Sequence, residues 1–204
     1  MITVINCGTG NIGSTVNMLK KVGVSAVVGS KVSDIENADK LILPGVGAFD
    51  SGIMHLNELG IIEVLNHKVL TEKTPILGIC LGMQLLTNGS EEGTWSGLGY
   101  INAEAKKFSF QEQEYSLKVP HMGWNSVTIH KDSPLFKNMY QEMRFYFVHS
   151  YHVVCNNPGD ILTTTPYGFE FVSSLQHENI MGTQFHPEKS HKYGKLLLEN
   201  FARF

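Results

Sequence analysis

The stretch PILGICLGMQLL, residues 75–86, decides the fold. Its first half is a run of apolar residues typical of a strand, and its second half has a helical pattern, so a sharp strand-to-helix turn is predicted at GICLG, residues 78–82. This is the G-x-S-x-G pattern of a nucleophile elbow with cysteine in place of serine. Glycines flank the nucleophile because larger side chains would collide in so sharp a turn. The pattern predicts Cys80 as a nucleophile at the edge of a sheet.

Strands and helices alternate through the first half of the chain. Strands are predicted at residues 2–6, 25–28, 40–43 and 75–79, and helical segments at residues 11–22, 51–70 and from 81 onward. Strands that are apolar on both faces and separated by helices are typical of a parallel sheet covered on both sides. The sequence therefore predicts an α/β fold with an open, mostly parallel sheet flanked by helices.

The second half changes character from about residue 97. Short β runs are predicted at residues 118–119, 125–130, 145–149, 152–155, 161–165, 170–175 and 180–185, followed by an amphipathic helix at 192–201. These short runs predict an antiparallel or mixed extension of the sheet. Without a linker or an internal repeat, residues 1–204 are expected to form a single domain.

The composition is that of an ordinary globular protein and excludes several kinds of partner. Of 204 residues, 42% are hydrophobic, and 16 basic residues stand against 19 acidic ones without a clustered basic stripe. We therefore expect no nucleic acid and no membrane as partners, and a cytoplasmic location. The three cysteines are widely spaced, and His149 and His152 lack a cluster of further ligands, so neither a metal site nor a cofactor is expected.

A thiolate nucleophile needs an acid and base close in space, and the candidates are His186 and Glu188 in GTQFHPEKS, residues 182–190. If the strand before His186 lies beside the strand that ends at Cys80, both side chains reach the same edge of the sheet. Glu188 would then orient the imidazole. Taken one at a time, His186 could be an ordinary histidine at a strand end, Glu188 a charge at the start of a helix, and Cys80 a small buried hydrophobic residue. Their joint occurrence in one chain favours a Cys-His-Glu triad.

Backbone amides are the candidate oxyanion donors. The N–H of Leu81 follows the nucleophile at the start of a predicted helix, a place that also favours the thiolate. Gly45, Val46 and Gly47 end another strand, and glycines there can direct N–H groups into a cleft. The alternative is an ordinary tight turn.

The first strand-to-helix turn carries Gly8, Gly10 and Gly13 in the spacing G-x-G-x-x-G, which is also found in dinucleotide-binding proteins. A nucleotide-binding regulatory module would need an acidic residue at the end of the second strand. Asp34 comes too late for that role. This interpretation is therefore kept only as an alternative.

Together, three strings resemble the class I, triad-type glutamine amidotransferases over essentially the whole chain: GICLGMQ at 78–84, PGVG at 44–47 and QFHPEKS at 184–190. The resemblance implies a flavodoxin-like fold, with Cys80 attacking the side-chain amide of L-glutamine and His186, oriented by Glu188, protonating the departing ammonia. It also implies an oxyanion hole at Leu81, Val46 and Gly47, and substrate contacts at the residues Gln84, Ser150 and Tyr151.

The strings PHMGWN at 120–125 and YFVHSY at 146–151 are similar to the glutaminase subunits of imidazole glycerol phosphate synthases. That resemblance implies a (β/α)₈-barrel cyclase as partner in a heterodimer, with Met122, Trp124 and Asn11 at the interface. A Trp124 buried in the protein's own core is the alternative. The opening Asn6-Cys7-Gly8 departs from the usual start of these subunits, which leaves open a related glutaminase that feeds a sugar-amidating enzyme of lipopolysaccharide biosynthesis.

Overall fold

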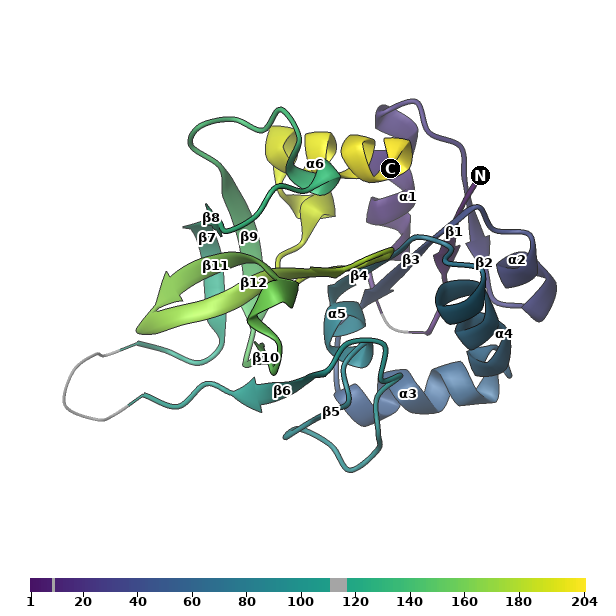
Figure 1. Ribbon diagram of the computed structural model, residues 1–204, viewed down its shortest axis with the longest axis horizontal. Helices are drawn as coiled ribbons and strands as arrows, with labels where there is room; N and C mark the ends of the chain where they lie inside the picture. The colour runs from purple at the N-terminus through teal and green to yellow at the C-terminus, as the bar shows by residue number, and fades with distance from the viewer. Residues whose placement is uncertain (9, 111–116) are drawn as a thin grey trace.

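The computed structural model describes residues 1–8, 10–110 and 117–204 (Figure 1). Its helices are α1 (Ile12–Lys21), α2 (Val32–Glu36), α3 (Phe49–Glu58), α4 (Ile62–Asn66), α5 (Leu81–Leu85) and α6 (His191–Arg203), with a π-helical turn at His67–Thr71 and 3₁₀ turns at Pro134–Phe136, Pro158–Asp160 and Pro187–Lys189. Its strands are β1 (Ile2–Ile5), β2 (Ala26–Gly29), β3 (Lys40–Gly45), β4 (Ile76–Cys80), β5 (Gly89–Ser90), β6 (Ala103–Lys107), β7 (His121–Ser126), β8 (Thr128–Ile129), β9 (Arg144–His149), β10 (Tyr151–Cys155), β11 (Ile161–Tyr167), β12 (Phe169–His177) and β13 (Ile180–Thr183).

A mixed sheet forms the centre of the molecule, with the order β2-β1-β3-β4-β13-β12-β10-β6-β5. The five strands from β2 to β13 are parallel, and β12 then begins an antiparallel extension. The predicted parallel core with a mixed extension is confirmed. The last strand in sequence, β13, inserts between β4 and β12, which brings the end of the chain next to the elbow strand.

Two hydrophobic cores lie on opposite faces of this sheet. In β3, Leu41 and Leu43 belong to one core and Ile42 to the other, as the two-residue period of a strand requires. Helices α3 and α5 pack together on one side, and α1 packs against α6 on the other (Figure 1). Both faces of β1, β3, β4 and β13 are therefore buried, which explains their continuous apolar sequence, whereas the edge strand β2 leaves Val27 and Val28 exposed.

Some predicted boundaries were wrong. The helical stretches predicted near 51–70 are α3, α4 and the π-helical turn, but α3 already begins at Phe49, and Gly60 lies between α3 and α4 at a φ of +64°. The run at 180–185 ends its ladder at Thr183, two residues early. No strand forms at 118–119, since pairing begins at His121, after Pro120, which has no N–H to donate.

The predicted strand at 125–130 is divided between two sheets. Strand β7 pairs with β9 in a separate two-stranded sheet, whereas β8 pairs with β11 of the main sheet. The change of partner at Val127, which is buried, ends one ladder and begins the other. The second half is thus more than a simple extension of the main sheet.

The surroundings of the glycine-containing turn after β1 do not resemble a nucleotide-binding site. A side chain at Gly8 would collide with the ring of His55, at 2.1 Å from Nε2. The carboxylate of Asp34 accepts hydrogen bonds from the backbone N–H groups of Ser30 and Lys31, both at 3.0 Å, and so stabilises the start of α2. Asp34 therefore has a structural role at the start of α2, after the end of β2 where a ribose contact would be needed.

Candidate active site

Cys80 occupies a strained turn between β4 and α5. Its φ of 54° and ψ of −109° lie outside the regions that side-chain-bearing residues favour, at a cost of roughly 1–3 kcal/mol. The two flanking glycines make this turn possible, because a Cβ at Gly78 would lie 2.6 Å from the carbonyl oxygen of Gly82, and one at Gly82 would lie 1.7 Å from that of Leu43. The geometry is that of a nucleophile elbow.

The parallel register brings three strand ends to one edge. Gly45, at the end of β3, lies opposite Cys80, and Thr183, at the end of β13, lies opposite Ile79. The chain continues from Thr183 through Gln184 and Phe185 to His186. Cysteine, histidine and the glycine-rich strand end therefore meet at the carboxyl edge of the sheet, where open α/β proteins form their sites.

His186 and Glu188 form a buried pair beside Cys80. The Nδ1 atom of His186 lies 2.8 Å from Oε1 of Glu188, and the two side chains are only 2% and 3% exposed. Because a carboxylate oxygen accepts, Nδ1 carries the proton. The other ring nitrogen, Nε2, is buried and makes no hydrogen bond of normal geometry to any described group. It is available for proton transfer.

Several interactions set the protonation of His186. Burial lowers the pKa of its imidazole, but the hydrogen bonds and charges of Cys80 and Glu188 outweigh burial and raise the pKa to about 9. An imidazolium is thereby favoured near neutral pH. A histidine beside a cysteine in this state is suited to stabilise a thiolate and to donate a proton to a leaving group.

Ser190 fixes the segment that carries this pair. Its Oγ donates to the carbonyl oxygen of His186 at 2.6 Å and accepts from the N–H of Tyr146 at 3.0 Å. The N–H of His186 in turn donates to the carbonyl oxygen of Tyr146 at 2.9 Å. The histidine is therefore held against β9. The string QFHPEKS contained Ser190, but its hydroxyl contacts depend on the distant β9 and could not be predicted.

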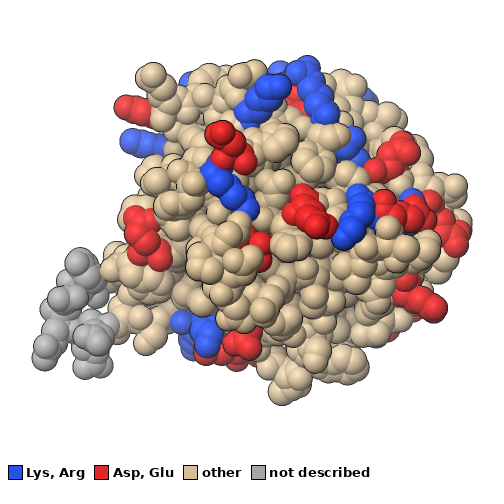
Figure 2. Space-filling model, viewed as in Figure 1, with Lys and Arg blue, Asp and Glu red and all other residues tan. Residues whose placement is uncertain are grey.

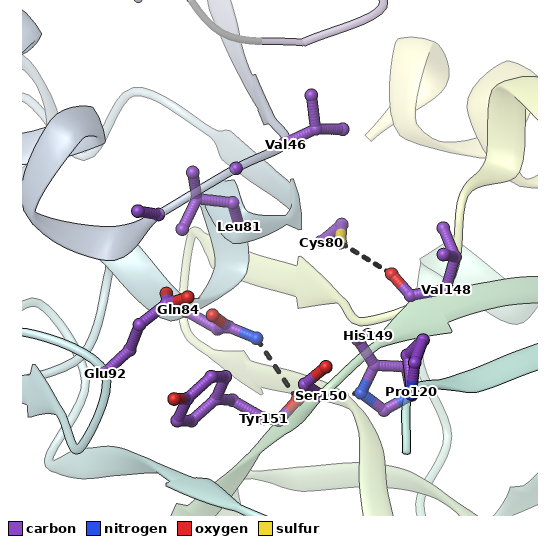
Figure 3. A pocket seen from close by; sticks show the side chains of 12 residues that line it. Val46, Cys80, Leu81, Gln84, Glu92, Pro120, Val148, His149, Ser150 and Tyr151 are labelled. Atoms are coloured by element: carbon purple, nitrogen blue, oxygen red, sulfur yellow. Dashed lines mark hydrogen bonds between the residues drawn. The ribbon is translucent and has the colours of Figure 1, made fainter. Parts of the chain in front are cut away.

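A pocket of about 480 Å³ opens beside the nucleophile (Figure 3). Seven of the predicted site residues line it: Val46, Gly47, Cys80, Leu81, Gln84, Ser150 and Tyr151. Val148 also lines it, and the thiol of Cys80 lies 3.9 Å from the Val148 carbonyl oxygen. The structure thus brings together the residues predicted for the oxyanion hole and for substrate binding, whose roles stay predictions.

Gln184 is a site residue that the sequence analysis missed. Its amide Nε2 lies 3.6 Å from the sulfur of Cys80, and its Oε1 accepts a hydrogen bond from Gln84 at 3.1 Å. The amide of Gln84 also donates to the carbonyl oxygen of Tyr151 at 3.3 Å. The sequence offered one signal, a glutamine within a predicted strand two positions before His186, but the burial of this side chain is visible only in the structure.

Glu92 was missed as well. Its carboxylate accepts from the backbone N–H of Phe49 at 2.9 Å and lines the same pocket as Gln84 and Tyr151 (Figure 3). Glu92 lies in the loop that follows β5. The carboxylate of Asp50 fixes this loop by accepting hydrogen bonds from the backbone N–H groups of Thr94 and Trp95. Nothing in the local sequence distinguishes Glu92 from Glu91 beside it, so only the fold identifies it.

The three predicted interface residues lie outside the pocket. Met122 and Trp124 project from β7 and are 62% and 44% exposed, which excludes the alternative of a Trp124 buried in the core. Pro120, just before this strand, lines the pocket, so the exposed face begins next to the site. Asn11 caps α1, with its side chain accepting from the N–H of Ser14 at 3.3 Å.

Other kinds of site find little support in the described ranges. They contain no group of three or more His, Cys, Asp or Glu side chains placed to hold a metal ion. No helix within them is both long and apolar enough to cross a bilayer. On the face shown in Figure 2, basic and acidic side chains are interspersed.

Comparisons with known proteins agree with this geometry. Residues 3–203 match the family described as "Glutamine amidotransferase class-I". A relative from Methanococcus maripaludis, named "Imidazole glycerol phosphate synthase subunit HisH 2", is 53% identical over 100% of this chain and 99% of its own length. A Pseudomonas aeruginosa protein of the same name is 47% identical over 99% of this chain and 98% of its own length.

Solved structures support the fold alone. A "glutamine amidotransferase" crystal structure superimposes with a TM-score of 0.74 at 18% identity, covering 98% of each chain. A putative GMP synthase protein from Thermoplasma acidophilum gives a TM-score of 0.71 at 24% identity, covering 99% of this chain and 92% of its own. With the elbow at Cys80, the buried His186–Glu188 pair and a family match over residues 3–203, this chain belongs to the class I glutamine amidotransferases.

Proposed function

We propose that this chain hydrolyses L-glutamine as the glutaminase subunit of an imidazole glycerol phosphate synthase. The observation that carries the proposal is the meeting of Cys80, the end of β3 and His186 at one sheet edge, beside a pocket of about 480 Å³. That volume is in the range that small-molecule sites occupy. Residues 1–204 act as one domain, and no cofactor takes part.

The reaction begins at the sulfur of Cys80. The thiolate attacks the side-chain amide carbon of glutamine, and the oxyanion that forms accepts hydrogen bonds from the N–H of Leu81 and from the segment of Val46 and Gly47. His186 gives its Nε2 proton to the departing ammonia, which leaves a thioester on Cys80. His186 then takes a proton from water, whose hydroxide attacks the thioester and releases glutamate.

The opposite side of the pocket supplies the groups that hold the amino-acid end of glutamine. Gln84, with the backbone of Ser150 and Tyr151, lies across the pocket from Val46, and Glu92 adds a carboxylate that suits a substrate ammonium (Figure 3). A zwitterionic substrate is thus matched by polar and charged groups, and its side-chain amide is left to face Cys80.

Ammonia explains the need for a partner. In water near neutral pH, ammonia is mostly ammonium, which has no lone pair for attack, so it must be passed directly to an acceptor site. We propose a (β/α)₈-barrel cyclase as that partner, in a heterodimer that forms imidazole glycerol phosphate and an aminoimidazole carboxamide ribotide. A reactive thiol at Cys80 must stay reduced, which fits the cytoplasm.

The face around β7 is the proposed docking surface. Met122 and Trp124 are exposed there, and both residue types are favoured in the centres of interfaces. Asn11, which we place at the same interface, belongs to the turn before α1. A Cβ at Gly10 in this turn would lie 3.4 Å from the Cα of Gly45, so the turn touches the strand end beside Cys80.

The test is glutamate formation by the purified chain, alone and with a barrel cyclase and its acceptor nucleotide. We expect low turnover alone and strong activation by the complete mixture. Activation by a sugar-amidating synthase in place of the cyclase would instead identify the lipopolysaccharide alternative. No glutamate under any condition, with a dinucleotide bound at equilibrium, would favour the nucleotide-binding module.

A further inference from the structure

A chain of hydrogen bonds runs from the docking strand β7 into the glutamine pocket. His121 of β7 lies opposite His149 of β9, and its Nδ1 is 3.0 Å from Nε2 of His149. The Nδ1 of His149 lies 2.7 Å from the carbonyl oxygen of Tyr151. At the outer end, the amide nitrogen of Asn125 lies 3.4 Å from Nε2 of His121 and donates to the carbonyl oxygen of Pro166 at 2.9 Å.

The carbonyl of Tyr151 fixes the direction of every proton in this chain. A carbonyl oxygen only accepts, so Nδ1 of His149 carries a hydrogen, and Nε2 of the neutral ring must accept. His121 therefore donates from Nδ1, and its own Nε2 accepts from the amide of Asn125. The three hydrogen bonds that lead from Asn125 to the Tyr151 carbonyl all point toward the pocket, and every ring nitrogen has a partner when both rings are neutral.

We propose that His121 and His149 are positioning residues, which hold the Tyr151 carbonyl, and through it the side chain of Gln84, in the geometry that binds glutamine. Gln84 donates one amide hydrogen to this carbonyl and the other to Gln184, whose amide lies at the sulfur of Cys80. A displaced Tyr151 carbonyl would leave Gln84 with an unpaired hydrogen inside a buried site, which is costly.

The surroundings leave the two rings little freedom. The His121 ring packs on Tyr167 and Phe147, at centroid distances of 4.1 and 4.8 Å, and the His149 ring packs on Phe108 at 5.2 Å. Burial also lowers the pKa of both imidazoles, His121 to about 4 and His149 to about 3. Both rings are therefore neutral at neutral pH, as the directed chain requires.

The arrangement also joins the docking surface to the pocket. Met122 and Trp124 are exposed on one face of β7, while His121, the residue before them, is buried on the other. A shift of β7 moves both faces together, because neighbouring residues share one backbone. This step rests on the proposed function, whereas the positioning of Tyr151 by the two histidines does not.

The first arm of the test observes the protons directly. In the full-length chain with ¹⁵N-labelled histidine, NMR at neutral pH should show His121 and His149 as neutral rings protonated at Nδ1, the tautomer less common in water. A proton on Nε2 of either ring, or a charged ring, would overturn the proposal.

The second arm measures glutamine affinity by calorimetry in a Cys80→Ala background, where hydrolysis is blocked. His121→Phe keeps the ring shape but loses the donor, and we expect about tenfold weaker binding. His121→Asn places an amide N–H near the Nδ1 position and should restore binding to within about twofold. The matched control is His152→Phe, because His152 packs on the same Phe108 at 4.8 Å but is not part of the chain.

Thermal unfolding of each variant separates positioning from simple loss of fold. Equal glutamine affinity in folded His121→Phe and its parent would overturn the proposal, as would an equal loss in His152→Phe. If the Cys80→Ala parent binds no glutamine at all, the proposed function fails. The NMR measurement of the His121 and His149 tautomers then decides by itself whether the directed chain of hydrogen bonds exists.

Discussion

The ring of Trp124 stacks on the ring of His191, with centroids 5.3 Å and planes 11° apart. His191 begins α6, directly after Ser190, which holds the carbonyl of His186. Trp124 also lies opposite Tyr146, whose backbone bonds to both His186 and Ser190. The exposed tryptophan of the proposed docking surface is thus two contacts away from the candidate catalytic histidine.

Trp124→Ala is expected to weaken binding of the proposed cyclase partner. A half-exposed tryptophan at the centre of an interface contributes about 2 kcal/mol or more when buried, which corresponds to roughly thirtyfold or more in dissociation constant. Trp95→Ala is the matched control, since Trp95 is 48% exposed but lies in the loop after β5. Equal effects of the two substitutions, measured by titration calorimetry with the partner, would remove Trp124 from the interface.

Cys80→Ala is expected to abolish glutamine hydrolysis, by on the order of a thousandfold or more, because no thioester can form. The fold and partner binding should be unchanged, since alanine fits the space of a thiol. Cys155→Ala is the control: this thiol lies on β10, and burial raises its pKa to about 12, which keeps it unreactive. Glutamate release is the measurement, and retained turnover in Cys80→Ala would rule out this nucleophile.

The pKa of His186, raised to about 9, predicts the alkaline limb of the pH profile. Turnover of the activated enzyme should fall as the pH rises through about 9, because His186 then loses the proton that it donates to the leaving ammonia. Glu188→Gln removes one cause of the raised pKa, so it should move this limb to lower pH and reduce kcat by about 10²- to 10⁴-fold. An unmoved limb in Glu188→Gln would contradict the role given to Glu188.

The same proton contributes to stability. Because the folded pKa of His186 lies above its ordinary value of 6.5, the stabilisation is complete below about pH 6.5 and is lost as the pH rises through about 9. The melting temperature of the parent should fall across this window, and that of Glu188→Gln should fall less.

Gly82→Ala tests the requirement for the elbow glycine. Its Cβ would lie 1.7 Å from the carbonyl oxygen of Leu43, so β3 and α5 would have to separate, at a cost of roughly 3 kcal/mol or more. Gly13→Ala is the control, because a Cβ there meets nothing within 4 Å and a helical alanine gains up to about 1 kcal/mol. Urea unfolding measures both, and a stable Gly82→Ala would show that the turn tolerates a side chain.

Sequence reasoning worked where local chemistry determines structure. The elbow at Cys80 was predictable because the tight turn requires glycines at fixed spacing, and the parallel core because buried strands are apolar on both faces. Strand β7 was placed wrongly, since His121, Gly123 and Asn125 show no apolar alternation and only the pairing with β9 makes them a strand. Gln184 and Glu92 were missed because their contacts cross the fold.

The buried histidines predict instability in acid. Burial lowers the folded pKa of His121 to about 4 and of His149 to about 3, whereas the unfolded chain titrates near the ordinary 6.5. The unfolded state therefore binds more protons below about pH 6.5, and stability falls as the pH drops from there toward the folded values. A charged His149 would also turn an N–H toward the Nδ1–H of His121, and a charged His121 would turn one toward the amide of Asn125. The melting temperature should fall by about 5 °C or more from about pH 7 to about pH 5, and less in His121→Asn, which has one titrating ring fewer. Equal slopes in the parent and His121→Asn would show that other groups cause the acid sensitivity.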